Sequence, residues 1–282
     1  MAGLLNPAST VFALGASDPE LVSIQYMLRK AGFSCALAYR NGKRCVSSNA
    51  YQADSHSRLI DTGQQVVWVE CRGSDYDPLR DLIVDHHNEG DPGFAAPPVN
   101  YWEGSSIGQV AKLVGGKHSD FKLVAASDHC LSAAMRGECP GVDPKELMAW
   151  RITARSAMAR IQPWVLRRRI ERATQRVLEL PRLILGGVQV VDGSFDSTPE
   201  LRDAAALVQI PILTTRKTPA GQIKIGLYGA EPDVVSEWLS SMRAADAVDH
   251  AYGNPHREYA GALLNRETSQ RLIRANAQET IF

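Results

Sequence analysis

The chain has 282 residues, of which 44% are hydrophobic and 22% charged, and this length favours one large or two medium-sized globular domains. Lys plus Arg and Asp plus Glu both number 31, so the zero net charge gives no overall attraction to nucleic acid. No apolar run approaches the roughly 20 residues that cross a bilayer. Together these features exclude the membrane, fibrous, disordered and disulfide-scaffold classes. We expect a cytoplasmic, reducing setting, because the N-terminus lacks the pattern of a signal peptide and the five cysteines show no C-x-x-C spacing.

Short apolar runs alternate with helical patterns through the first half of the chain. The predicted strands lie at 11–14, 33–39, 66–69, 82–84 and 123–126. Helices are predicted at 19–31 and at 105–113. This alternation is typical of an α/β fold with a parallel sheet.

The pattern changes in the second half of the chain. Residues 144–180 are helical in pattern, and strand-like runs return at 183–191, 210–214 and 222–227, before a helical segment at 232–243. We therefore predict two lobes: a domain at 1–142, a helical connector at 143–180, and a smaller α/β domain at 181–282.

Four acidic residues come at the ends of four predicted strands. Asp18, Glu70, Asp85 and Asp128 each follow a separate apolar run. The carboxyl ends of parallel strands converge on one crevice, where unpaired like charges would repel and raise one another's pKa. A bound divalent cation removes that conflict, and oxygen ligands with some imidazole suit Mn²⁺, Mg²⁺ or Zn²⁺.

Histidines accompany two of these acids. His86 and His87 follow Asp85, and His129 follows Asp128, so three of the seven histidines adjoin strand-end acids. A simpler interpretation is that each Asp caps the following helix or turn while each His packs locally. That interpretation suits a single pair, whereas the whole set favours a metal site.

The segment 84–90, Val-Asp-His-His-Asn-Glu-Gly, resembles the motif that names the DHH phosphoesterase family. This family includes RecJ-type exonucleases, small-RNA nucleases, cyclic-dinucleotide phosphodiesterases and a class of pyrophosphatases. Asp18-Pro19-Glu20 resembles the family's first motif, Glu70 stands where the second-motif Asp is expected, and Asp128 resembles the fourth motif. The chain departs from the family pattern at several positions, which are Glu20 and Glu70 in place of Asp, Leu14 in place of a His, and Leu21 in place of a Gly.

The resemblance implies a hydrolase with two divalent metal ions, most often Mn²⁺, with Mg²⁺ or Zn²⁺ as alternatives. The metal ligands it implies are Asp18, Glu20, Glu70, His86 and Asp128. Glu70 would bridge the two ions, Asp85 would orient its neighbours, and His87 would face the phosphate, so that Asp85, His86 and His87 form the catalytic group. A metal-activated water would then hydrolyse a phosphodiester or phosphomonoester.

The C-terminal segment 253–261 is loosely similar to the Gly-rich, His-containing segment of the family's substrate domain. Gly253, His256 and Arg257 would contact a substrate phosphate there; alternatively, the segment is a turn with solvated side chains. Residues 151–176 carry eight Arg and one Glu, which fits either a wall that attracts nucleotides or a solvated helical face.

The expected substrate is a small nucleotide, a cyclic dinucleotide or a short oligonucleotide, with no membrane partner and with homodimerisation as an option that the family suggests. Two other enzyme activities remain open, a single-strand exonuclease and a pyrophosphatase. A protein that binds or sequesters a nucleotide without turnover is the alternative from outside the enzymes.

Overall fold

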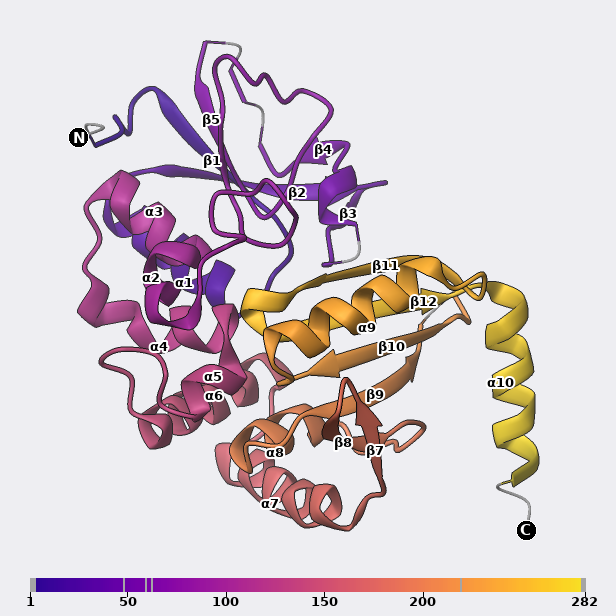
Figure 1. Ribbon diagram of the computed structural model, residues 1–282. Coiled ribbons are helices and arrows are strands. Elements are labelled where there is room, and N and C mark those ends of the chain that lie inside the picture. Colours follow the sequence, from indigo (N-terminus) through magenta and orange to yellow (C-terminus); the bar gives the residue numbers. More distant parts are fainter. Residues whose placement is uncertain (1–3, 48, 59, 62, 219, 280–282) are drawn as a thin grey trace. The chain divides into compact units, whose positions relative to one another are not determined.

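The structure is a computed structural model that describes residues 4–279 except 48, 59, 62 and 219. The chain is α/β and divides into two compact units, each with its own sheet (Figure 1). Unit 1 contains the chain up to His129 and Cys139–Met158, and unit 2 contains Cys130–Glu138 and the chain from Ala159 onward. The predicted boundary at 142 and connector at 143–180 do not coincide with this division, because the two connector helices make their contacts in different units.

The sheet of unit 1 has four parallel strands, each at a predicted position. They are β1 (Thr10–Leu14), β2 (Ser34–Arg40), β5 (Gln65–Val69) and β6 (Leu82–Val84). Two short strands, β3 (Lys43–Arg44) and β4 (Ser55–His56), each pair antiparallel with β2. The strand order across the sheet is β3-β2-β1-β5-β6, and β4 lies off this path. The register pairs Leu14 with Val69 and Val69 with Val84, so three parallel strands end level with one another.

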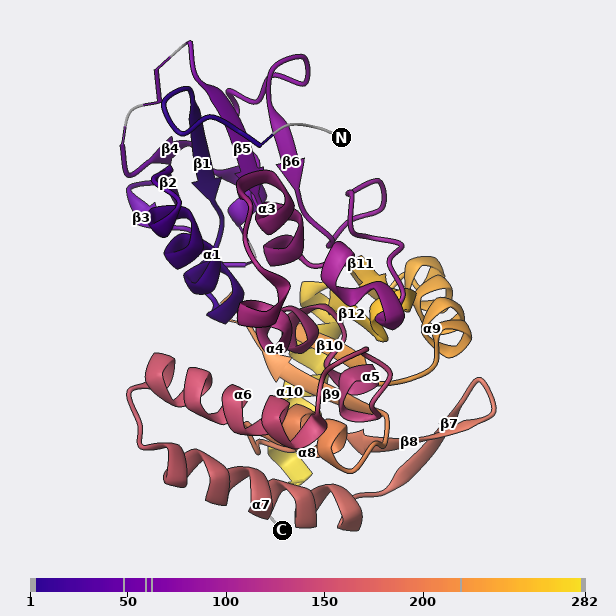
Figure 2. The same cartoon turned by 90° about the vertical axis from the view of Figure 1, so that its left-hand side faces the viewer.

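Two predicted helices of unit 1, α1 and α3, lie side by side along one face of this sheet (Figure 2). The helices of this unit are α1 (Pro19–Lys30), α2 (Tyr101–Gly104), α3 (Ser106–Val114), α4 (His118–His129) and α6 (Pro144–Ala159), with two short 3₁₀ turns, η1 (Ala50–Gln52) and η2 (Pro98–Asn100). The hydroxyl of Ser105 caps α3 by accepting a hydrogen bond from Gly108 N at 3.1 Å.

The predicted strand at 123–126 is wrong, because these residues form the middle of helix α4. A run of four apolar residues fits a buried helical turn as well as a strand. Two of the four are alanines, the strongest helix formers. Val124, Ala125 and Ala126 are all buried, so packing on the helical core of unit 1 decides the outcome.

Unit 2 is built on a six-stranded mixed sheet in the order β11-β12-β10-β9-β8-β7. Its strands are β7 (Arg182–Leu185), β8 (Val188–Gly193), β9 (Ile212–Lys217), β10 (Ile223–Tyr228), β11 (Val248–Asn254) and β12 (Tyr259–Leu264). Among these described strands, β8 and β9 are the one pair that runs parallel. The run at 183–191 forms two strands instead of one, because Gly186 and Gly187 take positive φ and turn the chain back as a hairpin.

Helices cover both faces of the second sheet. Its helices are α5 (Leu131–Met135), α7 (Pro163–Glu179), α8 (Leu201–Leu207), α9 (Pro232–Ala244) and α10 (Arg266–Glu279), with the 3₁₀ turn η3 (Pro255–Arg257). Helix α9 covers one face through Val235 and Trp238, and α7 and α8 pack on Val191 and Ile212 of the other face. None of the helices in the described part of the chain is long and apolar enough to cross a membrane.

On the face of the first sheet opposite α1, a buried carboxylate links strand β5 to the loop before β6. Asp81 accepts hydrogen bonds from Trp68 Nε1 at 3.0 Å, Val66 N at 3.2 Å and Asp77 N at 3.1 Å. Burial opposes its charge, yet the donors from Arg80 and Trp68 hold the pKa of Asp81 below its ordinary value. The loop that contains Asp77 is thereby fixed to strand β5.

We expect Asp81→Ala to destabilise the protein by about 2–3 kcal/mol, because buried donors of Trp68 and Val66 lose their acceptor. Urea unfolding followed by tryptophan fluorescence measures the change. The matched control is Asp61→Ala at an exposed acid of the same unit, which should alter stability by no more than about 0.5 kcal/mol. Equal effects of the two substitutions would contradict the role assigned to Asp81.

Candidate metal centre

Acidic side chains gather where the parallel strands of unit 1 end. Glu70 directly follows β5 and Asp85 directly follows β6, while Asp18 and Glu20 begin helix α1 just after β1. The chain segments that leave β1 and β5 touch: a Cβ at Gly15 would lie 2.2 Å from the carbonyl oxygen of Glu70. Only glycine fits at this position, and Glu70 itself takes a positive φ of 50°.

Two glutamates supply buried carboxylate oxygens. Glu20 is fully enclosed, with Oε1 accepting a hydrogen bond from Ile107 N at 2.9 Å. Among the described residues, neither Glu20 Oε2 nor Glu70 Oε1 has a hydrogen-bond partner. Buried carboxylate oxygens without a donor are costly, and a cation is the partner that suits them.

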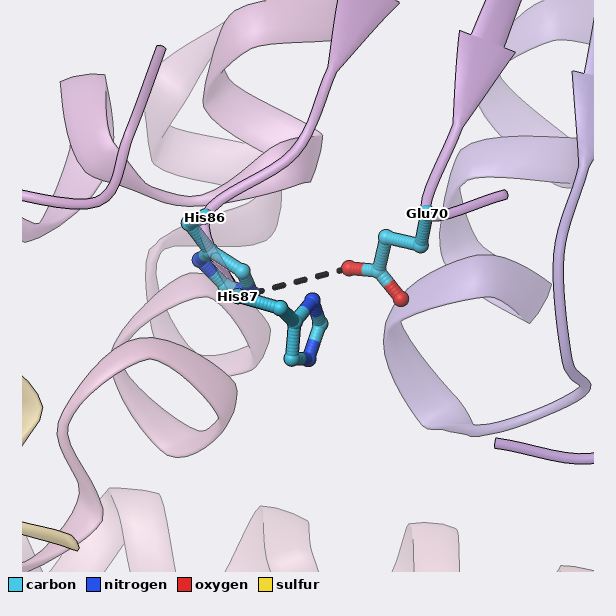
Figure 3. A group of neighbouring side chains, drawn as sticks. All are labelled: Glu70, His86 and His87. Atoms are coloured by element: carbon cyan, nitrogen blue, oxygen red, sulfur yellow. Dashed lines mark ion pairs between the residues drawn. The ribbon is translucent and has the colours of Figure 1, made fainter. Parts of the chain in front are cut away.

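The His86 imidazole points at these carboxylates. Its Nε2 lies 3.2 Å from Asp128 Oδ2, 3.6 Å from Glu70 Oε1 and 3.9 Å from Glu20 Oε2. Figure 3 shows the pair of His86 and Glu70 with the His87 ring beside them. Asp128 reaches the cluster from the last turn of helix α4, instead of from the end of a strand as its sequence pattern suggests.

The donor atoms of Glu20, Glu70, His86 and Asp128 all lie within 4.8 Å of one another, and Glu70, His86 and His87 form a second group by the same measure. Three carboxylates and one imidazole suit a hard or borderline divalent ion. The residues are therefore positioned to hold a metal ion, and four of the five ligands named from the sequence come together.

Asp18 is the fifth ligand named from the sequence, and it lies outside both groups. Its Oδ1 accepts a hydrogen bond from Leu21 N at 2.8 Å and caps helix α1. The simpler interpretation of a strand-end Asp, a helix cap, therefore describes at least one oxygen of this side chain.

Burial and mutual repulsion raise the pKa of the clustered acids. Desolvation raises the pKa of Asp18 to about 7, and the charge of Asp128 adds to the shift. Burial raises the pKa of Glu70 to about 8, with His87 opposing and Asp18 contributing. For Glu20, burial comes first and the nearby Asp128 and Glu70 follow, which together raise its pKa well above the ordinary value.

Asp85 behaves in the opposite way because donors surround it. Its carboxylate accepts hydrogen bonds from Tyr51 Oη at 2.7 Å, His87 Nδ1 at 2.8 Å and His86 N at 2.7 Å. Although burial opposes the charge, the donors from His87 and Tyr51 keep the pKa of Asp85 below its ordinary value. Asp85 therefore stays ionised, accepts from the backbone of His86 and holds the His87 ring through Nδ1.

A second histidine fixes the tautomer of His86. His129 Nε2 lies 2.9 Å from the carbonyl oxygen of Ala96, which only accepts, so this nitrogen carries the proton. In the neutral ring, His129 Nδ1 is then an acceptor, and the donor facing it at 3.1 Å is His86 Nδ1. The network assigns the proton of neutral His86 to Nδ1 and leaves the Nε2 lone pair toward the acids, the form that ligates a metal.

Sequence reasoning missed three residues around the cluster. The pattern gave no role to Tyr51, named His129 only as a neighbour of Asp128, and treated Arg151 as part of a charged helix. Arg151 is half-buried in unit 1 and donates to Ser127 Oγ at 2.8 Å; desolvation lowers its pKa to about 10 while Asp128 opposes the shift. The position of His129 directly after Asp128 was the one signal available in the sequence.

The predicted phosphate-contacting residues lie in unit 2. Gly253 belongs to β11 and pairs with Ala260 of β12. His256 is exposed on η3, whereas Arg257 is buried with its guanidinium 5.3 Å from the centre of the Tyr259 ring. Among these residues, His256 is the one that offers an accessible polar side chain.

No protein-family model matches the chain, and no curated protein matches it. The resemblance to the DHH phosphoesterases therefore depends on the motif residues and on the cluster they form.

We expect the stability of the metal-free protein to fall as pH rises from about 4 to 8. Acids whose pKa is raised by folding, such as Asp18 to about 7 and Glu70 to about 8, hold protons that the unfolded chain has released near pH 4. Thermal unfolding at several pH values measures this slope.

Glu20→Gln removes one buried charge, and should raise the Tm of the metal-free protein at pH 8 by roughly 2–4 °C. Added Mn²⁺ should stabilise the wild type more at pH 8 than at pH 5.5, and stabilise this variant far less. A variant that keeps the full Mn²⁺ effect would contradict a metal site at Glu20.

We expect His129→Ala to weaken divalent-metal binding by roughly 10- to 100-fold, since the ring that fixes the His86 tautomer is lost. His129→Asn is the matched rescue variant, because its side-chain oxygen stands close to the position of Nδ1 and can accept the His86 proton. Isothermal titration with Mn²⁺ measures the affinity, and nitrogen NMR of the metal-free protein reports the His86 tautomer. Equal losses in the two variants, with the His86 tautomer unchanged, would contradict this role.

Proposed function

We propose that unit 1 is the catalytic unit of a divalent-metal-dependent phosphoesterase. The observation that supports the proposal most is the set of Glu20, Glu70, His86 and Asp128, whose donor atoms lie within 4.8 Å of one another. The resemblance of the segments around them to the DHH motifs adds the reaction class.

The side chains have distinct roles in this proposal. Divalent ions, when bound, supply a water of lowered pKa and positive charge for the phosphoryl oxygens. Glu20, Glu70, His86 and Asp128 hold the ions, and Glu70 and His86 belong to both candidate groups. Asp85 holds His87 by Nδ1, and the half-buried His87 offers Nε2 to a phosphate oxygen or to a proton in transfer.

The substrate in this proposal is a phosphodiester or phosphomonoester of a nucleotide, a cyclic dinucleotide or a short oligonucleotide. Mn²⁺ is the first choice of metal, with Mg²⁺ and Zn²⁺ as alternatives. The neutral chain supports small substrates over long strands, because it lacks the overall positive charge that long polyanions attract.

One observation favours a second candidate, a protein that binds a nucleotide without turnover. Asp18 caps α1 and stays outside both ligand groups, so the ligand set is smaller than the one the family resemblance implies. Such a site could hold one ion and a phosphate without the second ion that assists hydrolysis.

A hydrolysis screen tests the proposal. The protein is stripped of metal, reloaded with Mn²⁺, Mg²⁺ or Zn²⁺, and mixed with cyclic dinucleotides, linear dinucleotides, 3′-phosphoadenosine phosphate, pyrophosphate and short single strands. We expect metal-dependent turnover of at least one substrate, and a loss of roughly 100-fold or more in Glu70→Gln. Glu103→Gln, at an exposed acid of the same unit, should retain activity.

The other outcomes separate the two candidates. Absence of turnover with every metal, combined with a nucleotide that still raises the Tm, would overturn the enzyme and support the binding protein. Turnover that survives Glu70→Gln would place the chemistry elsewhere.

A further inference from the structure

Unit 2 presents a second concentration of charge, of opposite sign, on one face of its sheet. Ile225 and Leu227 of β10 contribute to the apolar core beneath α9. Because side chains alternate along a strand, Lys224, Gly226 and Tyr228 belong to the opposite face.

A pocket of about 780 Å³ lies over this opposite face. It is lined by residues of β9, β10, the segment that leads into α8, and α10, all within unit 2. Those on which the inference depends are Arg202, Thr214, Arg216, Lys224, Tyr228 and Ile273. The volume falls in the range of small-molecule sites, roughly 300–1,000 Å³, and exceeds what a single phosphate ion fills.

Two positive side chains face each other across the floor of the pocket. Lys224 of β10 is the direct register partner of Arg216 of β9, and like charges directly opposite each other destabilise a sheet. Neither side chain has an ion pair with a described carboxylate. Asp196 is the only acid among the described lining residues, and its Oδ2 already lies 2.7 Å from Arg176 Nε.

The aromatic rings on this face hold the cations in place. The guanidinium of Arg202 lies 4.4 Å from the centre of the Tyr228 ring, and Lys224 Nζ lies 4.8 Å from the centre of the Tyr252 ring. Gly226 and Gly261 leave room for the two rings, since a Cβ at either would lie within 2.6 Å of a tyrosine side chain.

The pKa of Lys224 reflects its burial and the positive charges near it. Burial, followed by the charges of Arg216 and Arg202, lowers the pKa of the Lys224 ammonium to about 8. A bound anion would oppose both repulsive contributions and keep this ammonium charged at neutral pH.

We propose that this pocket binds a small phosphate monoester whose organic group is about the size of a nucleoside. A phosphate dianion matches the facing Arg216 and Lys224, with the hydroxyl of Thr214, the register partner of Gly226, as an additional donor. Ile273 of α10 supplies apolar surface for the organic group. The site is independent of the candidate metal centre and of Gly253, His256 and Arg257, since the pocket is lined by none of these residues.

The test is isothermal titration of the full chain in the presence of a chelator, with three probes: adenosine monophosphate, inorganic phosphate and adenosine. We expect the monophosphate to bind more tightly than inorganic phosphate, and adenosine to bind at least 10-fold more weakly than the monophosphate. Adenosine binding as tight as that of the monophosphate would overturn the assignment of a phosphate site. Equal affinity of the monophosphate and inorganic phosphate would overturn the part assigned to the organic group.

Variants identify the site. Arg216→Gln should weaken binding of the monophosphate at least 10-fold, while the ligand-free Tm stays the same or rises because one facing positive charge is removed. Lys224→Gln is the second variant and should act in the same direction. The matched control is Arg243→Gln, at an exposed arginine of α9, the helix that covers the opposite face of the sheet. This variant should bind the monophosphate as the wild type does.

The metal-centre variant Glu70→Gln separates this inference from the proposed function. Monophosphate binding that persists in Glu70→Gln and is lost in Arg216→Gln supports the pocket, whether or not the chain hydrolyses anything. Binding that is lost in Glu70→Gln and kept in Arg216→Gln would overturn it.

Discussion

Repulsion among buried carboxylates is the constraint around which unit 1 is organised. The level ends of β1, β5 and β6 bring the segments that carry Glu20, Glu70 and Asp85 together, and helix α4 adds Asp128. Apolar strands and helices enclose these acids, so solvent screens them poorly and the pKa of Glu70 rises to about 8. A fold that only had to be stable would place apolar side chains here. The arrangement is understandable when a cation offsets the charge.

The hydrogen bonds around the cluster follow from the same constraint. A ligand is useful only if its lone pair faces the ion, and the side chains that set this direction are Tyr51, Asp85 and His129. Asp85 accepts from Tyr51 and His87, which keeps it ionised and holds His87 by one nitrogen. His129, fixed by the Ala96 carbonyl, does the same for His86 by accepting at Nδ1. Asp85 of the Asp-His-His motif thus orients His87, and His129, from a distant part of the chain, orients His86.

The sequence predicts those parts of the fold and of the candidate site that depend on residues close together in the chain, and not those that depend on residues far apart in it. The strands at 11–14, 66–69 and 82–84 and their terminal acids follow from short apolar runs, a local signal. The run at 123–126 fails because four apolar residues do not distinguish a strand from a buried helical turn, yet Asp128 still reaches the cluster from the end of α4. Neither the partnership of His86 with His129, 43 positions apart, nor the facing of Arg216 and Lys224 has a sequence signature, since each depends on tertiary pairing.

The two clusters show that zero net charge is a sum and not an absence. Unit 1 concentrates carboxylates that suit a cation, and the pocket of unit 2 concentrates Arg202, Arg216 and Lys224, which suit an anion. The acids of unit 1 are mostly buried and poorly screened, whereas in unit 2 only Lys224 is half-buried, beside the exposed Arg216. In both places like charges lie close together, which raises the free energy of the ligand-free chain and favours binding of the opposite charge, more strongly where burial is greater. Exposed charges are screened within roughly 8–10 Å at physiological salt. The sign of charge that each cluster suits is therefore set by local geometry, and the neutral total gives long polyanions no general attraction.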